Sequence, residues 1–343
     1  MHGLLSQLGQ QSDLTLHPEY YLLTLPPARR VDVLIISTQA TLLAVLYGQR
    51  RCLGPWRTGF LTGGDAVGCG GLLSAPEMLL PALHQAASFY LHRDVHAMRW
   101  KLALPPDAPG IPEQLPEHLL GIGVRQAVSE SDPPGDILML ASTYDAFLAR
   151  LSKLTRRNLR YYRRQADAAG YRFERGVPFQ DYARRLQALG PVLRHPVSAW
   201  RLQGQAAMLD QFGGECAGLR SPDGVLEAGL CGFVREGRFH LLARYVNPDL
   251  ARQSLALVLC GYLIEELVAQ GCRELRFLNG ALFPFRRYCQ ARRLLELDLD
   301  RPRAILTPLK WVCGRTAQAR IAQRGSWERA LRRIAGTYGR ERG

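Results

Sequence analysis

The chain has 343 residues, 47% of them hydrophobic and 22% charged, a composition that excludes a disordered or fibrous protein and suffices for two domains with buried cores. The formal net charge of +14 is concentrated in residues 151–175, which carry +6, and residues 301–343, which carry +9. Because the remainder sums to −1, only these two segments support an argument about anionic partners.

The eight cysteines form no Cys-x-x-Cys pair and no cluster with histidine at metal-ligand spacing, so we expect reduced thiols and no metal site. The first residues, MHGLLSQLGQQSD, lack the basic and long apolar regions of a signal peptide, and polar residues interrupt the apolar run 33–47. These features predict a cytoplasmic protein without a transmembrane segment. They leave its oligomeric state open.

The first half predicts strands around one helix. The expected elements are strands over 31–36, 42–47, 58–62 and 95–104 and a helix over 76–91. The glycine-rich segment 63–71 lacks the Gly-Lys-Ser/Thr ending of a phosphate loop and is interpreted as a loop between sheet elements. Five prolines between residues 105 and 116 break any regular element there.

The basic segment 151–175 predicts part of one amphipathic helix that follows a short strand over 136–141. Ser142 or Thr143 can cap this helix, and Gly170 ends it. Its apolar stripe consists of Leu148, Leu151, Leu154, Leu159, Tyr162, Ala166 and Ala169. We expect the stripe to pack in the core, so that Leu154→Asp unfolds the protein. The opposite, arginine-rich side is expected to face solvent or the rim of a site, with a grip on phosphates as the alternative.

The second half predicts helices, then a three-stranded antiparallel meander, then a helix and a strand, which together make a mixed α/β layer architecture. The expected elements are helices over 179–193 and 200–212, strands over 215–220, 225–235 and 238–246, a helix from 248 to 271, and a strand over 273–278.

Two segments of this half are similar to a known family. LSKLTRRNLRYYRRQADAAGYRFE resembles the helix that opens the acetyltransferase-like domain of the Fem-like branch of the GNAT superfamily. GLCGFVREGRFHLLARYVNPDLARQSLALVLCGYLIEELVAQGCRELRFLNG resembles the strand–strand–helix–strand core of that family, whose relatives are associated with cellulose and biotin biosynthesis. The resemblance covers about residues 138–300.

The resemblance implies an α/β fold with mixed sheets, built as tandem GNAT-like (Fem-like) domains with a basic helical tail. We expect an N-terminal GNAT-like half over residues 1–140, an acyltransferase domain over 141–300 and the tail over 301–343. Amphipathic tail helices can dock on the body of the protein or, as a minority alternative, on a membrane surface.

The resemblance also implies acyl transfer from a thioester, with acetyl-CoA or another acyl-CoA as donor, to an amine or hydroxyl of a small metabolite or sugar precursor. The donor diphosphate would bind at the start of the helix that follows Asn247, where free N–H groups and the positive end of the helix dipole favour an anion. The candidate residues are Arg252, Gln253, Ser254, Leu255 and Ala256. The superfamily pattern [QR]-x-x-G-x-[GA] retains its first residue here but has leucine at its two small positions, so we expect weak coenzyme A binding.

Further candidates follow the last core strand. Asn279 is expected to be catalytic, with an Asx turn as the structural alternative. Tyr288 is expected to protonate the leaving thiolate, with a packed tyrosine as the alternative. Tyr245, Arg286 and Arg287 are the candidate substrate-binding residues.

Two other functions fit the same fold. Fem-like relatives take aminoacyl groups from charged tRNA, whose phosphates the two basic segments would suit. An altered acyltransferase fold can also serve as a non-catalytic scaffold of an exopolysaccharide system, with the basic tail on an anionic membrane surface.

Overall fold

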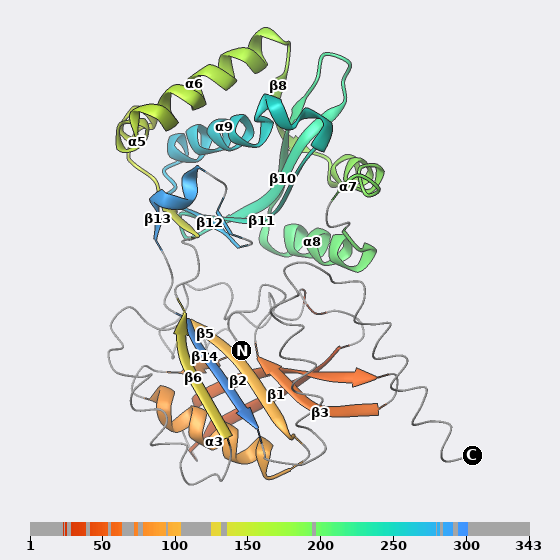
Figure 1. The fold of residues 1–343 in the computed structure, drawn as a ribbon, viewed down its shortest axis with the longest axis vertical. Coiled ribbons are helices and arrows are strands. Elements are labelled where there is room, and N and C mark those ends of the chain that lie inside the picture. The colour runs from red at the N-terminus through yellow and green to blue at the C-terminus, as the bar shows by residue number, and fades with distance from the viewer. Residues whose placement is uncertain are drawn as a thin grey trace, which may run out of the picture.

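Figure 1 shows the computed structural model of the chain, in which two mixed sheets form separate lobes. The structure describes residues 23, 25, 29–38, 42–53, 56–63, 72–74, 78–93, 95–103, 125–131, 136–193, 197–278, 280–281, 284–290 and 294–300. Asn279 and the tail 301–343 lie outside these residues, so the tail helices stay a prediction.

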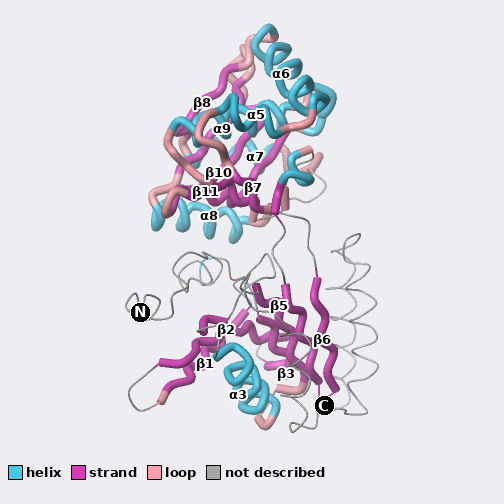
Figure 2. Tube along the Cα trace, turned by 90° about the vertical axis from the view of Figure 1, so that its left-hand side faces the viewer, coloured by secondary structure: helices cyan, strands magenta, loops and turns pink. Residues whose placement is uncertain are grey.

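The N-terminal lobe is a seven-stranded sheet with α3 lying against it (Figure 2). Its strand order is β1-β2-β3-β5-β14-β6, with β4 paired to β2. The elements are β1 (Arg29–Ser37), β2 (Leu42–Leu53), β3 (Trp56–Gly63), β4 (Leu72–Ser74), α3 (Leu79–Leu91), β5 (Ala97–Ala103), β6 (Arg125–Ser131) and β14 (Leu294–Asp300). All four strands and the helix predicted for this half are confirmed. The polar sequence of β6, RQAVSES, gave no comparable signal.

The C-terminal lobe is a second seven-stranded sheet, in the order β13-β7-β12-β11-β10-β9-β8. Its strands are β7 (Ile137–Met139), β8 (Arg172–Val177), β9 (Glu215–Arg220), β10 (Leu226–Arg235), β11 (Arg238–Val246), β12 (Glu274–Phe277) and β13 (Cys289–Gln290). The predicted meander is confirmed, because β9, β10 and β11 pair antiparallel in sequence order. β12 then joins β11 in parallel.

Strand pairing does not follow the expected division into residues 1–140 and 141–300. β7 pairs with β12 and β13 and therefore belongs to the second sheet. β14 returns to the first sheet, where it lies between β5 and β6. Alternation of apolar residues identifies a strand but not the sheet that it joins, so the sequence did not reveal this return.

Helices cover both faces of the second sheet (Figure 1). The helical segments are α5 (Tyr144–Arg150), α6 (Lys153–Ala168), α7 (Phe179–Ala188), α8 (Ala199–Phe212), η4 (Pro248–Gln253), α9 (Leu255–Ala269) and η5 (Phe285–Tyr288). Residues of α5, α6 and α9 share one buried cluster, whereas those of α7 and α8 share another. Among the described residues, no helix has the length and hydropathy needed to cross a membrane.

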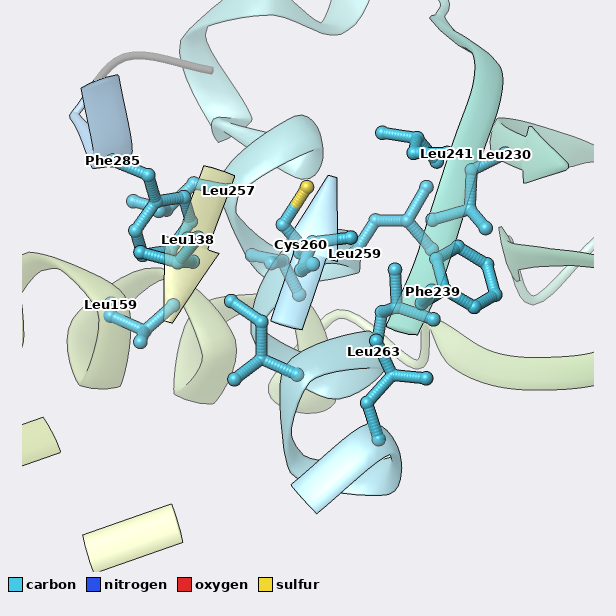
Figure 3. Packing of buried hydrophobic residues seen from close by; sticks show 14 of the residues in the cluster. Leu138, Leu159, Leu230, Phe239, Leu241, Leu257, Leu259, Cys260, Leu263 and Phe285 are labelled. Carbon is cyan, nitrogen blue, oxygen red and sulfur yellow. The ribbon is translucent and has the colours of Figure 1, made fainter. Parts of the chain in front are cut away.

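The central helix of this lobe is α9, which is apolar almost all round and lies in the middle of its cluster (Figure 3). Helix α6 packs closely on it at Gly261. A Cβ at this position would lie 2.7 Å from Cδ1 of Leu159, so the glycine permits the close approach of the two helices.

The single helix predicted from about residue 142 to 170 is wrong in one respect, because it is broken into α5 and α6. Thr143 caps α5, with its Oγ1 accepting a hydrogen bond from the N–H of Ala146 at 3.1 Å. Ser152 starts a second helix in the same way, since its Oγ accepts a hydrogen bond from the N–H of Thr155 at 3.3 Å. Two such caps, each with its own side-chain hydrogen bond, mark two helices.

The break changes which side chains of α6 are buried. Leu154 is 56% exposed, whereas Thr155, Leu159 and Ala166 are buried. The prediction that Leu154 packs in the core, and that Leu154→Asp unfolds the protein, is therefore wrong. The predicted apolar stripe assumes one continuous helix. The extended backbone of Leu151 interrupts it, so the residues of α6 face different directions from those that one helix would give them.

Candidate functional site

Strands β11 and β12 part halfway along β11. Their parallel pairing ends where Leu241 lies opposite Phe277. At the same point the register between β10 and β11 shifts, which leaves Leu242 as an extra residue on β11. Such a bulge bends a strand and interrupts its ladder. Residues 243–246 therefore extend beyond β12, and none of the described strands pairs with that edge.

The chain then passes through a short turn into α9. Asn247 accepts a hydrogen bond from the N–H of Asp249 through its Oδ1 at 3.2 Å. Ser254 adopts a left-handed conformation (φ +52°) between η4 and α9, and its carbonyl accepts from the N–H of Leu257 at 2.9 Å. The amides of Leu255 and Ala256 precede this first bond and have no acceptor within the helix. They form the positive end of the helix dipole beside the parting strands.

The expected donor residues lie around these amides. Arg252 and Gln253 are exposed, and Ser254 and Ala256 are partly buried. The two leucines that stand at the small positions of the superfamily pattern are in the core, Leu255 with 1% and Leu257 with 7% of its surface exposed. Their bulk therefore points away from the solvent side of the first amides.

A polar network fixes the turn that leads to α9. Glu227 accepts hydrogen bonds at its Oε2 from Nδ2 of Asn247, at 3.0 Å, and from the guanidinium of Arg185 on α7. The backbone N–H of Asn247 donates to the carbonyl of Glu227 at 2.8 Å. Sequence reasoning missed Glu227 and Arg185, because only the register of β10 and β11 brings them beside Asn247.

Tyr245 lies in the core and not at the surface. It is 4% exposed, and its hydroxyl donates a hydrogen bond to the carbonyl of Leu226 at 3.3 Å. Its ring lies 5.2 Å from that of Tyr182 on α7. Burial raises the pKa of Tyr245, with smaller effects of neighbouring charges. The bulge at Leu242 helps to explain the missed orientation, since an extra residue reverses the inward and outward alternation of the strand beyond it.

A second group of expected residues meets the first turn of α6. The hydroxyl of Tyr288 accepts from the N–H of Ser152 at 2.8 Å and donates to Oγ1 of Thr155 at 3.2 Å. The guanidinium of Arg287 donates to both side-chain hydroxyls and lies 4.8 Å from the Tyr288 ring centroid. Arg286 is exposed. Ser152 and Thr155 were not expected in a site; the only signal was the capping potential of a serine before a helix.

These contacts change the acidity of Tyr288. Partial burial raises its pKa, but hydrogen bonds with Ser152, Thr155 and Arg287 outweigh that effect and lower the pKa to about 8. A phenol with this pKa is mostly protonated at pH 7 and can give up its proton readily.

The two groups lie at opposite ends of α6. Tyr288 contacts the first turn of the helix, whereas Gln253 forms a side-chain hydrogen bond with Tyr171, just beyond the last turn. Sixteen residues at a rise of 1.5 Å make α6 about 24 Å long. Tyr288 is therefore not adjacent to the first amides of α9. Within the described ranges, no three His, Cys, Asp or Glu side chains are grouped so that they could hold a metal ion.

Residues 153–288 match the family profile of the acetyltransferase (GNAT) domain. No curated protein matches the chain. The fold is similar to that of FemX, with a TM-score of 0.58 and 10% identity over 87% of this chain and 95% of that one. It is also similar to a tandem GNAT protein from the clavulanic acid biosynthesis pathway, with a TM-score of 0.52 and 13% identity over 87% and 94% of the two chains.

A third similar structure is the C-terminal domain of a putative lysylphosphatidylglycerol synthetase from Agrobacterium fabrum, with a TM-score of 0.51 and 12% identity over 87% and 91% of the two chains. Identities this low show the fold alone. The chain thus has the mixed α/β fold of tandem GNAT and Fem-like structures, and its match over residues 153–288 supports a transferase.

Proposed function

We propose that the protein is a GNAT-type acyltransferase that moves an acyl group, in the first place acetyl, from an acyl-CoA to an amine or hydroxyl of a small metabolite or sugar precursor. The observation that carries this proposal is the parting of β11 and β12 at Leu242, from which the chain continues through η4 to the free N-terminus of α9. Both features lie within the segment that matches the acetyltransferase domain profile. An acyl-CoA donor implies a cytoplasmic enzyme.

Each donor residue has a physical role in this proposal. The N–H groups of Leu255 and Ala256 bind the diphosphate, which the helix dipole also attracts. Arg252 and the hydroxyl of Ser254 add a charge-assisted and a neutral hydrogen bond. The free edge of residues 243–246 offers backbone groups to the amides of the extended donor arm, as an exposed strand edge does for a peptide.

The reaction needs little beyond positioning. The nucleophile attacks the thioester carbonyl, a C–N or C–O bond forms, and the C–S bond breaks, so the nucleophile loses one proton and the thiolate gains one. Tyr288 lies at the end of α6 that is remote from the first amides of α9. An elongated donor whose diphosphate binds these amides can therefore approach Tyr288 only with its thioester end. A phenol of pKa about 8 is matched to a thiol as proton donor. Asn279 remains a catalytic candidate, and Arg286 and Arg287 remain candidates for substrate binding.

Isothermal titration with acetyl-CoA and with free CoA tests the donor. We expect saturable binding of both, together with a raised melting temperature, because a ligand of the native state stabilises it. The absence of heat and of thermal protection at millimolar ligand would overturn the coenzyme A assignment.

A second candidate, aminoacyl transfer from charged tRNA, is favoured by one observation. Helix α6 has no acidic residue in its first turn, and Lys153, Arg157, Arg160 and Arg164 are exposed along it. No ion pair with another described residue involves these four side chains. Filter binding of charged tRNA at several salt concentrations separates the candidates, since phosphate contacts give a steep salt dependence.

A further inference from the structure

Arg244 lies in the angle where β11 and β12 part. Its Nη1 donates a hydrogen bond to the carbonyl of Gly280 at 3.4 Å, and its Cζ lies 5.9 Å from the ring centroid of Phe277. Burial raises the pKa of Cys260 on α9 to about 11, and the charge of Arg244 acts against this rise. A partly buried cation thus lies on the segment of β11 whose edge towards β12 is free.

Six other partly buried arginines of this lobe contact a carboxylate. These pairs are Arg163 with Glu265, Arg175 with Glu215, Arg185 with Glu227, Arg220 with Glu174, and Arg238 and Arg276 with Glu274. Pairing of this kind is expected, because a charge withdrawn from water is costly unless an opposite charge or several hydrogen bonds compensate it.

Arg244 has no such partner in the described part of the chain, as is also true of the partly buried Arg156 and Arg235, but Arg244 lies where β11 and β12 part. Among the described residues, no carboxylate lies within ion-pair distance of it, and its hydrogen bond to Gly280 is long. The positions of the neighbouring loop outside the described residues are Asn279, Leu282 and Phe283, none of which is acidic. The sequence of that loop therefore supplies no counter-charge either.

We propose that Arg244 binds a carboxylate of the substrate. The enzyme then uses either an acyl group that carries a free carboxylate or an acceptor that carries one. The planar guanidinium fork matches a carboxylate through two parallel N–H···O bonds, and partial burial strengthens such a pair. This inference rests on the proposed acyl transfer, since it assumes that the substrate enters where the strands part. It assigns a substrate class to a residue on the strand that precedes the donor helix.

The first test distinguishes a structural role of Arg244 from a role in ligand binding. Arg244→Gln removes a charge with no described counter-charge, so the unliganded variant should melt at or above the temperature of the wild type. Arg276→Gln, which removes the ion pair with Glu274, should melt at a lower temperature than the wild type. A melting temperature of Arg244→Gln clearly below that of the wild type would show a structural role and overturn the proposal.

The second test uses carboxylates and neutral analogues on the full chain. Succinate and succinamide are compared as free ligands, succinyl-CoA and butyryl-CoA as donors, and amino acids and their carboxamides as acceptors in a CoA-release assay. We expect the wild type to prefer the carboxylate by about tenfold or more in at least one comparison, the size of a charge-assisted pair. The donor and acceptor comparisons then tell whether the acyl group or the acceptor carries it.

The variants give the controls for this test. Arg244→Gln should lose the preference, Arg244→Lys should keep part of it, and Arg235→Gln, a partly buried arginine at the far end of the neighbouring strand, should keep all of it. If the wild type binds or uses the carboxylate and its neutral analogue equally well in all three comparisons, the proposal is overturned. If acetyl-CoA still binds in that case, the proposed acyl transfer from coenzyme A survives. A carboxylate preference without any coenzyme A binding would instead support the Arg244 site and overturn the acyl-CoA donor.

Discussion

The hydroxyl of Tyr288 accepts a hydrogen bond from the backbone N–H of Ser152, which lies 136 residues earlier in the chain. The bond ties η5 to the first turn of α6 and satisfies an N–H at the start of that helix, where no backbone acceptor is available. Arg287 closes the same cluster through the hydroxyls of Ser152 and Thr155. The N-terminus of α6 thus stabilises the phenolate form of Tyr288 more than its neutral form.

We therefore predict one tyrosine that ionises near pH 8. An ultraviolet titration of the wild type minus that of Tyr288→Phe should show it, and Arg287→Gln should move the midpoint towards the ordinary value near 10. Because the pKa is depressed in the folded state, the associated stability is present above pH 10 and is lost as the pH falls through 8. The unfolding free energy of the wild type relative to Tyr288→Phe should accordingly rise between pH 8 and 10. A flat difference over this range contradicts the prediction.

The exposure of α6 residues predicts a sharp contrast between two leucines. Leu159 is 1% exposed and packs against Gly261, so Leu159→Ala should cost about 2–5 kcal/mol of unfolding free energy. Leu154→Ala, at an exposed position of the same helix, should change it by less than about 0.5 kcal/mol. Denaturant unfolding of both variants measures the contrast, and equal costs would show that the break between α5 and α6 is misplaced.

The polar network at the turn before α9 predicts a linked effect on folding and donor binding. Asn247→Ala removes the contacts of this side chain with Glu227 and with the N–H of Asp249, which should cost about 1–3 kcal/mol. The turn should also loosen, so that acetyl-CoA binds more weakly than to the wild type. Calorimetry and denaturant unfolding measure the two effects. Ser221→Ala provides the control, because it also removes a turn hydrogen bond, in the turn between β9 and β10.

Local signals explain what the sequence predicts well. The meander follows from Gly237 and the Ser-Pro-Asp-Gly turn between apolar strands, and α9 follows from a long apolar run between a proline and a glycine. Each of these signals lies within a few residues of the element that it defines. The two leucines of the donor pattern are likewise visible in the local sequence. The direction of their side chains is not.

The remaining features depend on contacts that are distant in the sequence. The bulge at Leu242 is a property of the register between β10 and β11, and it affects the face of the sheet on which Tyr245 packs. The bond between Ser152 and Tyr288 and the lack of a described counter-charge at Arg244 require the packed lobe. Periodicity and spacing carry no information on such pairs, so a sequence identifies candidate residues more readily than their partners.

The donor site predicts a specific role for Arg252. The side chain is exposed at the end of η4, two residues before the left-handed Ser254 and the free amides of α9. A charge-assisted contact with the diphosphate is worth about 1.5–3 kcal/mol, so Arg252→Ala should weaken acetyl-CoA binding by roughly 10- to 150-fold. Isothermal titration measures the loss, which should shrink at high salt because the contact is exposed.

Arg172→Ala is the matched control for Arg252→Ala. Arg172 is also exposed and follows Tyr171, the residue that contacts Gln253, so it carries the same charge at the same end of α6 without belonging to the turn into α9. If only the general positive field mattered, both variants would weaken binding equally. A loss confined to Arg252→Ala, together with loss of binding in Ala256→Trp, which fills the space before the first amides, would assign the diphosphate to this helix N-terminus.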